Sequence, residues 1–461
     1  MLDPEQWLPL LVVVFTFISV LLLSLPSTFG AEIRFQKDRD PVKPRVQVVV
    51  LGDIGRSPRI QYHALSIAKN GGLVDLIGYT RSQVHPKISS DSRITVHGLA
   101  PAPDFLRTNN KWLFLFFAPL KVIFQTLSLY YTLGYRTEPA KWLLVQNPPT
   151  IPTLLVAQAI CFIRNTRLVI DWHNFGYSIL GLKLGLTHPL VRLSRLLERT
   201  FTAKATAHLA VSNAMVRVLK NSWGLTDLVL PLHDRPFPEF QPLEESQRTK
   251  FLTQCPETAP FMHKIQSGNM NLLVSSTSWT PDEDFSVLLD ALVSYSGLAT
   301  KAQPRLPEIL AIITGKGPQK ESFLSRIGAL TKAGKLSRVH LRTAWLSIGD
   351  YAKLLGSADL GVSLHTSSSG VDLPMKVVDM LGCGLPVVGW DGFEAWPELV
   401  QEGINGHGFH SSDGLCTALA SLFGDEKQQL RRLRQGALLE GRRRWDDEWN
   451  AVAGKLLGLC T

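Results

Sequence analysis

Two series of short apolar segments alternate with helix-like stretches, and this alternation constrains the fold more than any other feature. The first series is RVQVVVLGD (45–53), LVDLIGY (73–79), RITVHGL (93–99), KWLLVQN (141–147) and TRLVIDWHN (166–174). The second is NLLVSSTSW (271–279), PEILAIITGKGP (307–318), SRVHLRTAWL (337–346), DLGVSLHTSSSG (359–370) and LPVVGW (385–390). Because strands that alternate with helices build parallel sheets covered on both faces, we predict an α/β chain with two doubly wound, Rossmann-like domains.

The chain of 461 residues is too long for one hydrophobic core. A proline-rich polar stretch at 232–268 separates the two series and is the expected interdomain connector. The predicted domains are therefore 45–231 and 269–440, followed by a last amphipathic helix at 441–461.

Residues 7–29 form an apolar run without a single charge. The run is long enough to cross a bilayer as a helix. A cleavable signal peptide is the competing interpretation, but Asp3 and Glu5 precede the run and no Lys or Arg does. Basic residues follow the run, so the positive-inside rule places the rest of the chain in the cytosol. We expect an N-terminal transmembrane anchor of the signal-anchor type.

Residues 111–135 and 151–163 are apolar nearly all round. The first segment has the length of a second membrane span, but Lys121 near its middle and its place between two strands argue against one. We expect helices that cover the sheet, with part of an apolar face on the bilayer. Fully buried core helices are the alternative.

The net charge of +9 suits anionic ligands or an anionic membrane surface. No basic block or aromatic signature for nucleic acid accompanies it, so no nucleic-acid partner is expected. The five cysteines are scattered and have no metal-ligand spacing. No metal site is predicted.

A glycine turn follows the second strand of the second series. Gly315 and Gly317 flank Lys316 where this strand gives way to a helix. Such glycines let backbone N–H groups approach a phosphate, and the helix N-terminus and Lys316 add favourable charge. Strand ends without a ligand also carry turns of this kind. The turn therefore indicates a phosphate site only together with the motif that follows.

The stretch SSSGVDLPMKVVDMLGCGLPVV (367–388) keeps two carboxylates and a lysine among apolar residues and glycines. Lys376 and Asp379 are three residues apart and share one face of a helix that begins near Pro374. We expect the loop amides and Lys376 to bind a diphosphate, and Asp379 to bind ribose hydroxyls. A capped helix with one surface ion pair is the alternative. The candidate donor-binding residues are Gly315, Lys316, Gly317, Ser368, Ser369, Gly370, Asp372, Lys376 and Asp379.

The second domain resembles the nucleotide-sugar half of GT-B glycosyltransferases, which carry a similar glycine turn and an acidic-x7-acidic motif. Two departures stand out: Asp372 is shifted by one position against that spacing, and SSTSWTPDEDF lacks the Arg and Lys of many relatives. Five further motifs extend the resemblance over nearly the whole chain, to the chitobiosyldiphosphodolichol β-mannosyltransferases. They are LGDIGRSPRIQYHALSIA, QNPPTIPTLLVA, DWHNFGYSIL, LPLHDRP and TSSSGVDLPMKVVDMLGCGLPV.

The resemblance implies a GT-B fold and transfer of mannose from GDP-mannose to GlcNAc2-PP-dolichol, with a β-1,4 bond formed and GDP released. It also implies an enzyme of the endoplasmic reticulum membrane with its catalytic body on the cytosolic face, and association with other mannosyltransferases of the pathway. The donor is a substrate, and no cofactor is expected. Two alternatives remain: a transferase with another lipid acceptor or donor, and an inert, membrane-anchored subunit of a transferase assembly.

An α-linked donor and a β-linked product require inversion, and hence a general base. DWHN closes a strand at the edge where open α/β sheets bind their ligands. We rank Asp171 and His173 as base candidates, with Asp53 behind them. A histidine that only contacts the sugar, and an aspartate that only caps the strand end, are the alternatives. The loop GDIGRSPR is expected to hold the acceptor pyrophosphate through Gly52, Gly55, Arg56 and Arg59; a glycine turn with solvated arginines is its alternative.

Overall fold

The computed structural model describes residues 44–106, 111–280, 283–301, 306–424 and 427–460. The predicted anchor at 7–29 therefore lies outside the described residues. Within the described part of the chain, every helix is too short or too polar to cross a bilayer.

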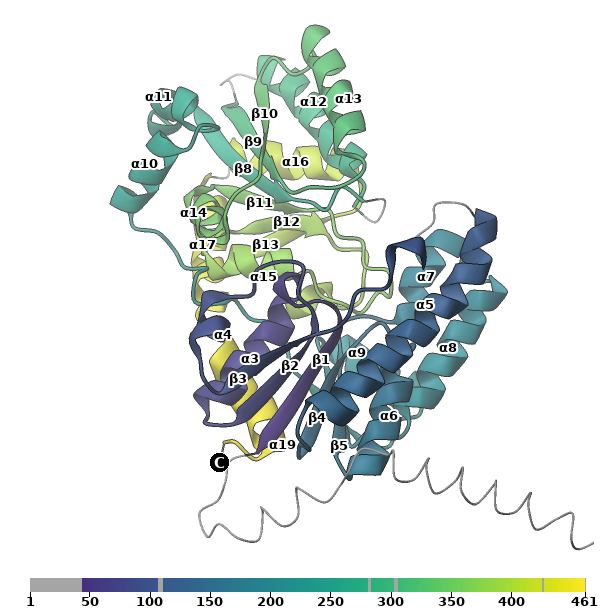
Figure 1. The fold of residues 1–461 in the computed structure, drawn as a ribbon. Coiled ribbons are helices and arrows are strands. Elements are labelled where there is room, and N and C mark those ends of the chain that lie inside the picture. The colour runs from purple at the N-terminus through teal and green to yellow at the C-terminus, as the bar shows by residue number, and fades with distance from the viewer. Residues whose placement is uncertain (1–43, 107–110, 281–282, 302–305, 425–426, 461) are drawn as a thin grey trace, which may run out of the picture.

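The first domain is built on a seven-stranded sheet in which all neighbouring strands are parallel, in the order β3-β2-β1-β4-β5-β6-β7 (Figure 1). Its strands are β1 (Arg45–Asp53), β2 (Leu73–Tyr79), β3 (Ile94–Gly98), β4 (Trp142–Asn147), β5 (Arg167–Trp172), β6 (Ala207–Ala210) and β7 (Leu228–Pro231). Val48 pairs with Leu76 on one side and with Leu144 on the other, and all three are fully buried. Burial on both faces explains why these strands are continuous Val, Ile and Leu runs.

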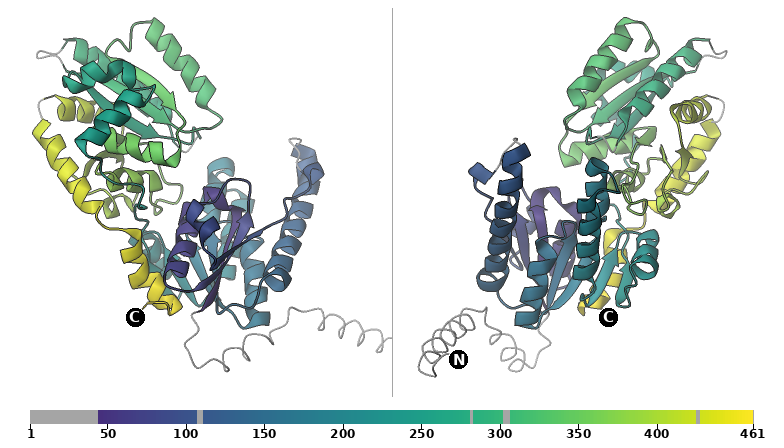
Figure 2. Two further views of the ribbon diagram at one scale, coloured as in Figure 1. Left: turned by 60° about the vertical axis from the view of Figure 1, so that its left-hand side comes forward. Right: turned by 90° about the vertical axis from the view of Figure 1, so that its right-hand side faces the viewer.

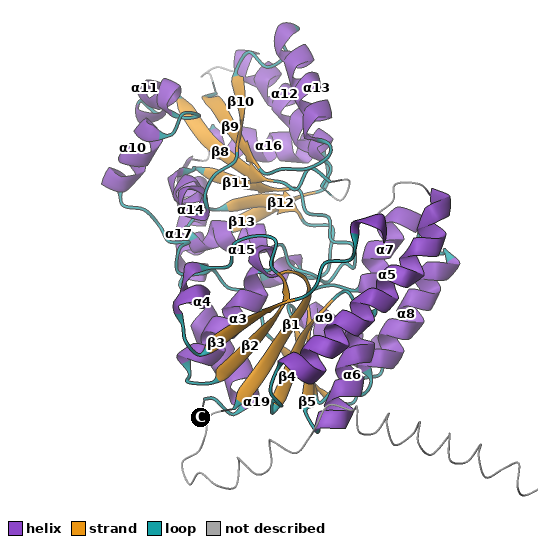
Figure 3. Cartoon of the chain, viewed as in Figure 1, coloured by secondary structure: helices purple, strands orange, loops and turns teal. Residues whose placement is uncertain are grey.

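Helices cover this sheet on both faces (Figure 3). They are α3 (Pro58–Lys69), α4 (Pro86–Ser90), α5 (Lys111–Tyr131), α6 (Thr153–Arg164), α7 (Gly176–Leu184), α8 (Pro189–Thr202) and α9 (Asn213–Arg217). The predicted segment 111–135 forms α5 and a short π-helical turn at Thr132–Arg136. Leu129 and Leu133 are buried, whereas Phe116 is 74% exposed, so the alternative of a fully buried core helix is wrong for this segment.

The second domain has a six-stranded parallel sheet in the order β10-β9-β8-β11-β12-β13. Its strands are β8 (Met270–Ser276), β9 (Glu308–Thr314), β10 (Val339–Ala344), β11 (Leu360–Ser363), β12 (Val387–Trp390) and β13 (Gly406–Phe409). Its helices are α12 (Phe285–Lys301), α13 (Lys320–Lys332), α14 (Ile348–Ser357), α15 (Met375–Gly382), α16 (Ser412–Phe423) and α17 (Lys427–Glu440). Two doubly wound domains are therefore present, as predicted.

The connector is more ordered than its composition suggests. Within 232–268 the chain forms α10 (Glu245–Gln254) and α11 (Met262–Gln266), and α10 packs against α14 of the second domain. Only 232–244 remains as an irregular link.

The end of the chain returns to the first domain. It consists of α18 (Trp445–Trp449), a π-helical turn at Asn450–Gly454 and α19 (Lys455–Leu457), and it runs beside α3 (Figures 1 and 2). The indole of Trp142 in β4 donates to the carbonyl of Leu457 at 3.2 Å. The predicted terminal helix at 441–461 is thus a strap of short pieces that binds the two domains together.

Candidate functional site

The carboxyl ends of the two sheets meet at a contact between the domains. Asn174, two residues past the end of β5, donates to Ser368 Oγ at 3.1 Å, and Ser178 Oγ lies 3.2 Å from the same atom. Ser212 Oγ donates to the carbonyl of Val371. This contact joins the DWHN motif to the SSSG loop, the two stretches that the sequence singles out in different domains.

A buried ion cluster of Arg59, Asp171 and Asp234 lies near this contact, at the carboxyl end of β5. The guanidinium of Arg59 in α3 donates to both carboxylate oxygens of Asp171 at 2.7–3.2 Å. It also donates to Asp234 Oδ1 at 2.8 Å and to the carbonyl of Leu232 at 2.9 Å. Arg59 and Asp171 are fully buried. Burial opposes the charge of Asp171, but Arg59 and His63 outweigh it and hold its pKa well below the ordinary value.

This arrangement corrects the expectation that Arg59 holds the acceptor pyrophosphate directly. Its side chain has no exposure and its donors are taken by two carboxylates and a carbonyl. Asp234 comes from the connector, 175 positions further along the chain, and sequence reasoning missed it. The LPLHDRP motif that contains Asp234 was the available signal.

Two histidines face Asp171, His63 from α3 and His173 from the end of β5. His63 Nδ1 accepts from the indole of Trp449 at 2.9 Å, which leaves Nε2–H to face Asp171 Oδ2 at 3.3 Å. His173 Nε2 lies 3.0 Å from the same oxygen, and its side chain is 22% exposed. With its charge held by Arg59, Asp171 orients His173 with Nε2 protonated and Nδ1 left to accept. Of the two leading base candidates, only His173 reaches solvent.

The glycine loop after β1 is organised by Asp53. Its carboxylate accepts from the backbone N–H of Arg81 and Ser82 at 3.2 Å and from Ser82 Oγ at 2.6 Å. Burial opposes its charge, but these bonds from Ser82 and Arg81 lower its pKa. A side chain at Gly55 would meet the carbonyl of Gln83 at 2.4 Å, so this glycine permits close backbone packing.

The other members of the predicted acceptor set lie in the same loop. Gly52 is half-buried, and an added Cβ there would meet Val50 at 3.2 Å. The side chain of Arg56 is 82% exposed, and it donates to Ser82 Oγ at 3.3 Å. Arg56 is therefore the member of the set whose guanidinium is open to a ligand.

In the second domain, the glycine turn packs on the segment that follows β8. A Cβ on Gly315 would lie 1.8 Å from the carbonyl oxygen of Thr277, and one on Gly317 would lie 1.8 Å from that of Ser278. Gly315 also has φ +129°, a conformation that L side chains rarely adopt. Lys316 is exposed, with Nζ 4.2 Å from the ring centroid of Trp345.

Lys376 meets the same segment from the other side. Its ammonium pairs with Glu283 and lies 3.4 Å from Ser278 Oγ. The second oxygen of Glu283 accepts from the N–H of Ser278 at 2.6 Å and from Thr277 Oγ1 at 2.8 Å. The glycine turn and Lys376 thus converge on Thr277, Ser278 and Glu283, as a shared donor site requires. The sequence gives no sign that Glu283 pairs with Lys376.

The SSSG loop is held from within by Asp372. Its side chain, 8% exposed, accepts from Ser369 Oγ at 2.9 Å and from Ser367 Oγ, and its Oδ2 lies 2.8 Å from His365 Nε2. The N–H of Gly370 is taken by Ser367 Oγ at 2.8 Å. Asp372 therefore shapes the loop, while Ser368 faces the first domain.

Asp379 lies on α15 but does not pair with Lys376, whose partner is Glu283. Burial first, and then the nearby carboxylate of Asp234, raise the pKa of Asp379 well above the ordinary value. The carboxylate of Asp379 in the second domain and that of Asp234 in the connector therefore repel each other, and a hydroxyl that donates to Asp379 would stabilise its charged form.

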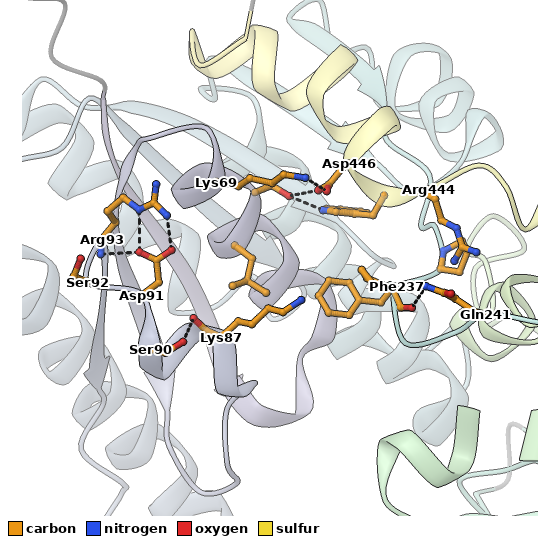
Figure 4. A pocket seen from close by; sticks show the side chains of 15 residues that line it. Lys69, Lys87, Ser90, Asp91, Ser92, Arg93, Phe237, Gln241, Arg444 and Asp446 are labelled. Carbon is orange, nitrogen blue, oxygen red and sulfur yellow. Dashed lines mark hydrogen bonds and ion pairs between the residues drawn. The ribbon is translucent and has the colours of Figure 1, made fainter. Parts of the chain in front are cut away.

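A cavity of about 910 Å³ lies elsewhere, between α3, α4, the connector and α18 (Figure 4). Its ionic groups include two internal pairs, Lys69 with Asp446 and Arg93 with Asp91. None of the predicted site residues lines it. Within the part of the chain that the structure describes, no cluster of three or more His, Cys, Asp or Glu is spaced to hold a metal ion.

Comparison with known structures agrees with the fold. The chain is similar to Anabaena Alr3699/HepE in complex with UDP and glucose, with a TM-score of 0.60 and 18% identity over 89% of this chain and 98% of that one. It is also similar to sucrose-phosphate synthase from Thermosynechococcus elongatus, with a TM-score of 0.64 and 13% identity over 90% and 98% of the two chains. The fold is that of the GT-B glycosyltransferases.

Sequence comparison identifies the family. Residues 272–425 match the model of glycosyl transferases group 1. Chitobiosyldiphosphodolichol β-mannosyltransferases from three organisms are similar over most of their length. That of Arthroderma benhamiae is 54% identical over 80% of this chain and 83% of its own, that of Yarrowia lipolytica 41% over 98% and 94%, and that of Mus musculus 38% over 89% and 88%. The chain therefore belongs to the chitobiosyldiphosphodolichol β-mannosyltransferase family.

Proposed function

We propose that the protein transfers mannose from GDP-mannose to GlcNAc2-PP-dolichol with inversion, forming a β-1,4 bond and releasing GDP. One observation carries this proposal beyond family membership: the contact of Asn174 and Ser178 with Ser368. This contact supports the proposal because it brings the strand end that carries Asp171 and His173 close to the candidate donor loop of the other domain.

In this proposal His173 takes the proton of the acceptor hydroxyl at Nδ1, while Asp171 holds Nε2–H and stabilises the imidazolium that forms. The departing diphosphate receives positive charge from Lys376 and Lys316 and backbone amides from the glycine turn. Asp379 binds the ribose, with a hydroxyl donating to its carboxylate. Arg56 attracts the acceptor pyrophosphate from the opposite domain.

The test is a transfer assay with labelled GDP-mannose and a GlcNAc2-pyrophosphoryl phytanyl acceptor, followed by β-mannosidase digestion of the product. We expect a mannosylated lipid that β-mannosidase cleaves completely. Resistance to β-mannosidase would contradict inversion. Absence of transfer from every GDP-sugar tested would favour the inert-subunit alternative, and transfer only to another lipid would favour the alternative acceptor.

We also propose that no metal ion takes part, because lysines and amides supply the charge that the leaving group needs. Transfer rates should then be the same with and without EDTA, and restoration by Mg²⁺ or Mn²⁺ of a rate lost in EDTA would contradict this. The proposed location is the endoplasmic reticulum membrane with the catalytic body on the cytosolic side and with other mannosyltransferases as partners. Protease accessibility of intact microsomes and co-purification test these two points.

A further inference from the structure

The outer side of the helices beside the first sheet carries a broad apolar surface. The right-hand view of Figure 2 faces this layer. On α5 the exposed residues recur at helical spacing, and α6 and the α7–α8 hairpin continue them. This outer helical face comprises Phe116, Leu120, Ile123, Leu127, Leu155, Phe162, Leu182, Leu184, Leu186, Leu190, Leu193 and Leu196.

The outer helical face is unusual for helices that cover a sheet. Their inner sides are already apolar and buried, as Leu129, Ile160 and Val191 are. A surface helix normally turns polar residues outward. Here Phe162 is 90% exposed and Leu186 is 64% exposed. Because α5 packs against α6, α6 against α8 and α8 against α7, these exposed apolar side chains gather on one helical layer, and such a concentration marks an interaction site.

The charge of these helices identifies the partner. Between Lys111 and Thr202, α5, α6, α7 and α8 contain one acidic residue, Glu198, and its side chain is fully buried against Asn147 and the backbone of Gly176. The exposed charged side chains described on these helices are all cationic: Lys121, Lys183, Arg192, Arg195 and Arg199. An apolar face whose own helices expose only positive charges complements an anionic lipid surface, where basic side chains meet headgroups and leucines enter the acyl boundary.

The face is continuous with the candidate site. Helix α7 begins at Gly176, three residues after His173, and its backbone N–H groups at Gly176 and Tyr177 donate to Glu198 of α8. The α7–α8 hairpin is therefore fixed to the strand end that carries the base candidate. A surface that seats the hairpin on a bilayer also sets the distance of His173 from that bilayer.

We propose that the outer helical face docks on an anionic leaflet and holds the domain contact at the height of the headgroups, where a lipid-linked pyrophosphate is presented. The role in acceptor delivery rests on the proposed function, whereas docking itself does not. The leucines of α8 provide the apolar contact, and Arg192 and Arg199 provide selectivity for anionic lipid.

Docking is tested with an environment-sensitive fluorophore on the full-length protein, at Leu193→Cys in α8 or at Ser325→Cys on exposed α13 as the matched control. Wild-type protein carried through the same labelling gives the background of the native cysteines. Vesicles of phosphatidylcholine, alone or mixed with phosphatidylserine, carry a spin-labelled lipid as quencher. We expect at least twofold quenching at position 193 in the anionic vesicles and none at 325. Equal quenching at both positions would overturn the proposal.

Two other occupants have their own signatures. If a second copy or another segment of this chain covers the face, the label at 193 is blue-shifted without vesicles and insensitive to the quencher, and the proposal fails. In Arg192→Gln/Arg199→Gln we expect less quenching in anionic vesicles and unchanged quenching in phosphatidylcholine alone. The partition coefficient for anionic vesicles should fall by about fivefold for each charge removed. Unchanged partitioning of this variant would overturn the role of the basic residues.

The link to acceptor delivery has a separate readout. Leu190→Ser/Leu193→Ser/Leu196→Ser should raise KM for acceptor in vesicles several-fold and leave KM for a short-chain, water-soluble acceptor unchanged. Leu298→Ser/Leu439→Ser, at two exposed leucines of the second domain, is the matched control. Equal rises for both acceptors would overturn the link. Quenching without any transfer would leave docking standing and refute the proposed function instead.

Discussion

At the scale of single residues, His173 makes the sharpest prediction about catalysis. In His173→Ala we expect kcat to fall by about 10²–10⁴-fold, the usual contribution of a positioned general base. Thermal stability should change little, because the ring is 22% exposed and is bonded to Asp171, which keeps Arg59 and His63 as partners. Initial rates and a thermal melt measure both quantities.

The matched control for this variant is His340→Ala. His340 pairs with Glu308 at 3.1 Å near the start of β10, far along the strand from the edge that faces the other domain. Its removal should leave kcat unchanged. If His173→Ala retains the wild-type kcat, the base lies elsewhere and His173 only contacts substrate.

Lys376 allows donor binding to be separated from folding. In Lys376→Met we expect KM for GDP-mannose to rise more than about tenfold, because a charge-assisted bond to a phosphate is lost. The melting temperature should also fall, because Glu283, 5% exposed, keeps a buried carboxylate without its cation. Steady-state kinetics at varied donor concentration and thermal melts give the two values.

The double variant Lys376→Met/Glu283→Gln completes the cycle. Removing the second charge should restore part of the melting temperature without restoring KM. Recovery of both quantities together would show that Lys376 acts only through the fold of the 277–283 segment. Lys353→Met, at an exposed lysine paired with Asp350 on α14, should match the wild type in both measurements.

At the scale of elements, the turn between β9 and α13 depends on the absence of a side chain. Gly317→Ala places a methyl group where the carbonyl of Ser278 already lies, at 1.8 Å, so the turn must move away from the donor segment. We expect a stability loss of about 1–3 kcal/mol and a raised donor KM. Gly328→Ala, within α13 and with nothing inside 4 Å, should instead be neutral or stabilising by up to about 1 kcal/mol. Urea unfolding compares the two, and equal losses would contradict the packing argument.

The elements that the sequence predicts are the long apolar ones. All ten predicted strands are present, because most are buried runs of β-branched and aliphatic residues; the edge strands β3 and β10 are partly exposed. The strands β6, β7 and β13 were missed, since each has only four residues and each contains His, Pro or Gly, which weaken the strand signal. Helices α10 and α11 were missed because the connector is polar and proline-rich, and they form through packing on the second domain.

The candidate site likewise contains residues that the sequence predicts and partners that it does not. Residues next to a strand end, such as Asp171 and His173, are predictable because parallel strands place their carboxyl ends at one edge. The partners that these residues contact from distant parts of the chain are not predictable. Nothing local to Arg59 indicates that Asp171 and Asp234 will enclose it, and nothing local to Lys376 indicates Glu283, 93 positions away. Such pairings are set by the tertiary fold.

At the scale of the whole molecule, His233 connects three parts of the chain. Its Nε2 lies 3.0 Å from Glu398 of the second domain, and its Nδ1 lies 2.9 Å from Glu448 in α18. Glu398 also accepts from the first N–H groups of α9, at Asn213 and Ala214, at 2.6 and 2.7 Å. The charge on His233 is therefore a charge on the interface between the domains.

Burial opposes protonation of His233, but hydrogen bonds to Glu398 and Glu448 outweigh it and raise its pKa above the ordinary value of 6.5. A group whose pKa is raised on folding stabilises the folded state fully below its unfolded pKa, and that stability disappears as the pH rises through the folded value. The neighbouring Arg235, which pairs with Glu440 and Glu448, acts in the opposite direction and lowers the pKa of His233 through charge repulsion.

We therefore expect the melting temperature to fall as the pH rises from 6.5 through the raised pKa of His233. In His233→Gln, which keeps a donor but cannot titrate, this fall should be absent and the melting temperature at low pH should be lower than in the wild type. Burial opposes the charge of both carboxylates, but His233 and Arg235 lower the pKa of Glu448 to about 2, and His233 also lowers the pKa of Glu398, so both stay charged over this range. Scanning calorimetry over the pH series measures the difference. Parallel curves for the two proteins would show that His233 does not titrate at the interface, and a steeper fall in His233→Gln would reverse the sign of the argument.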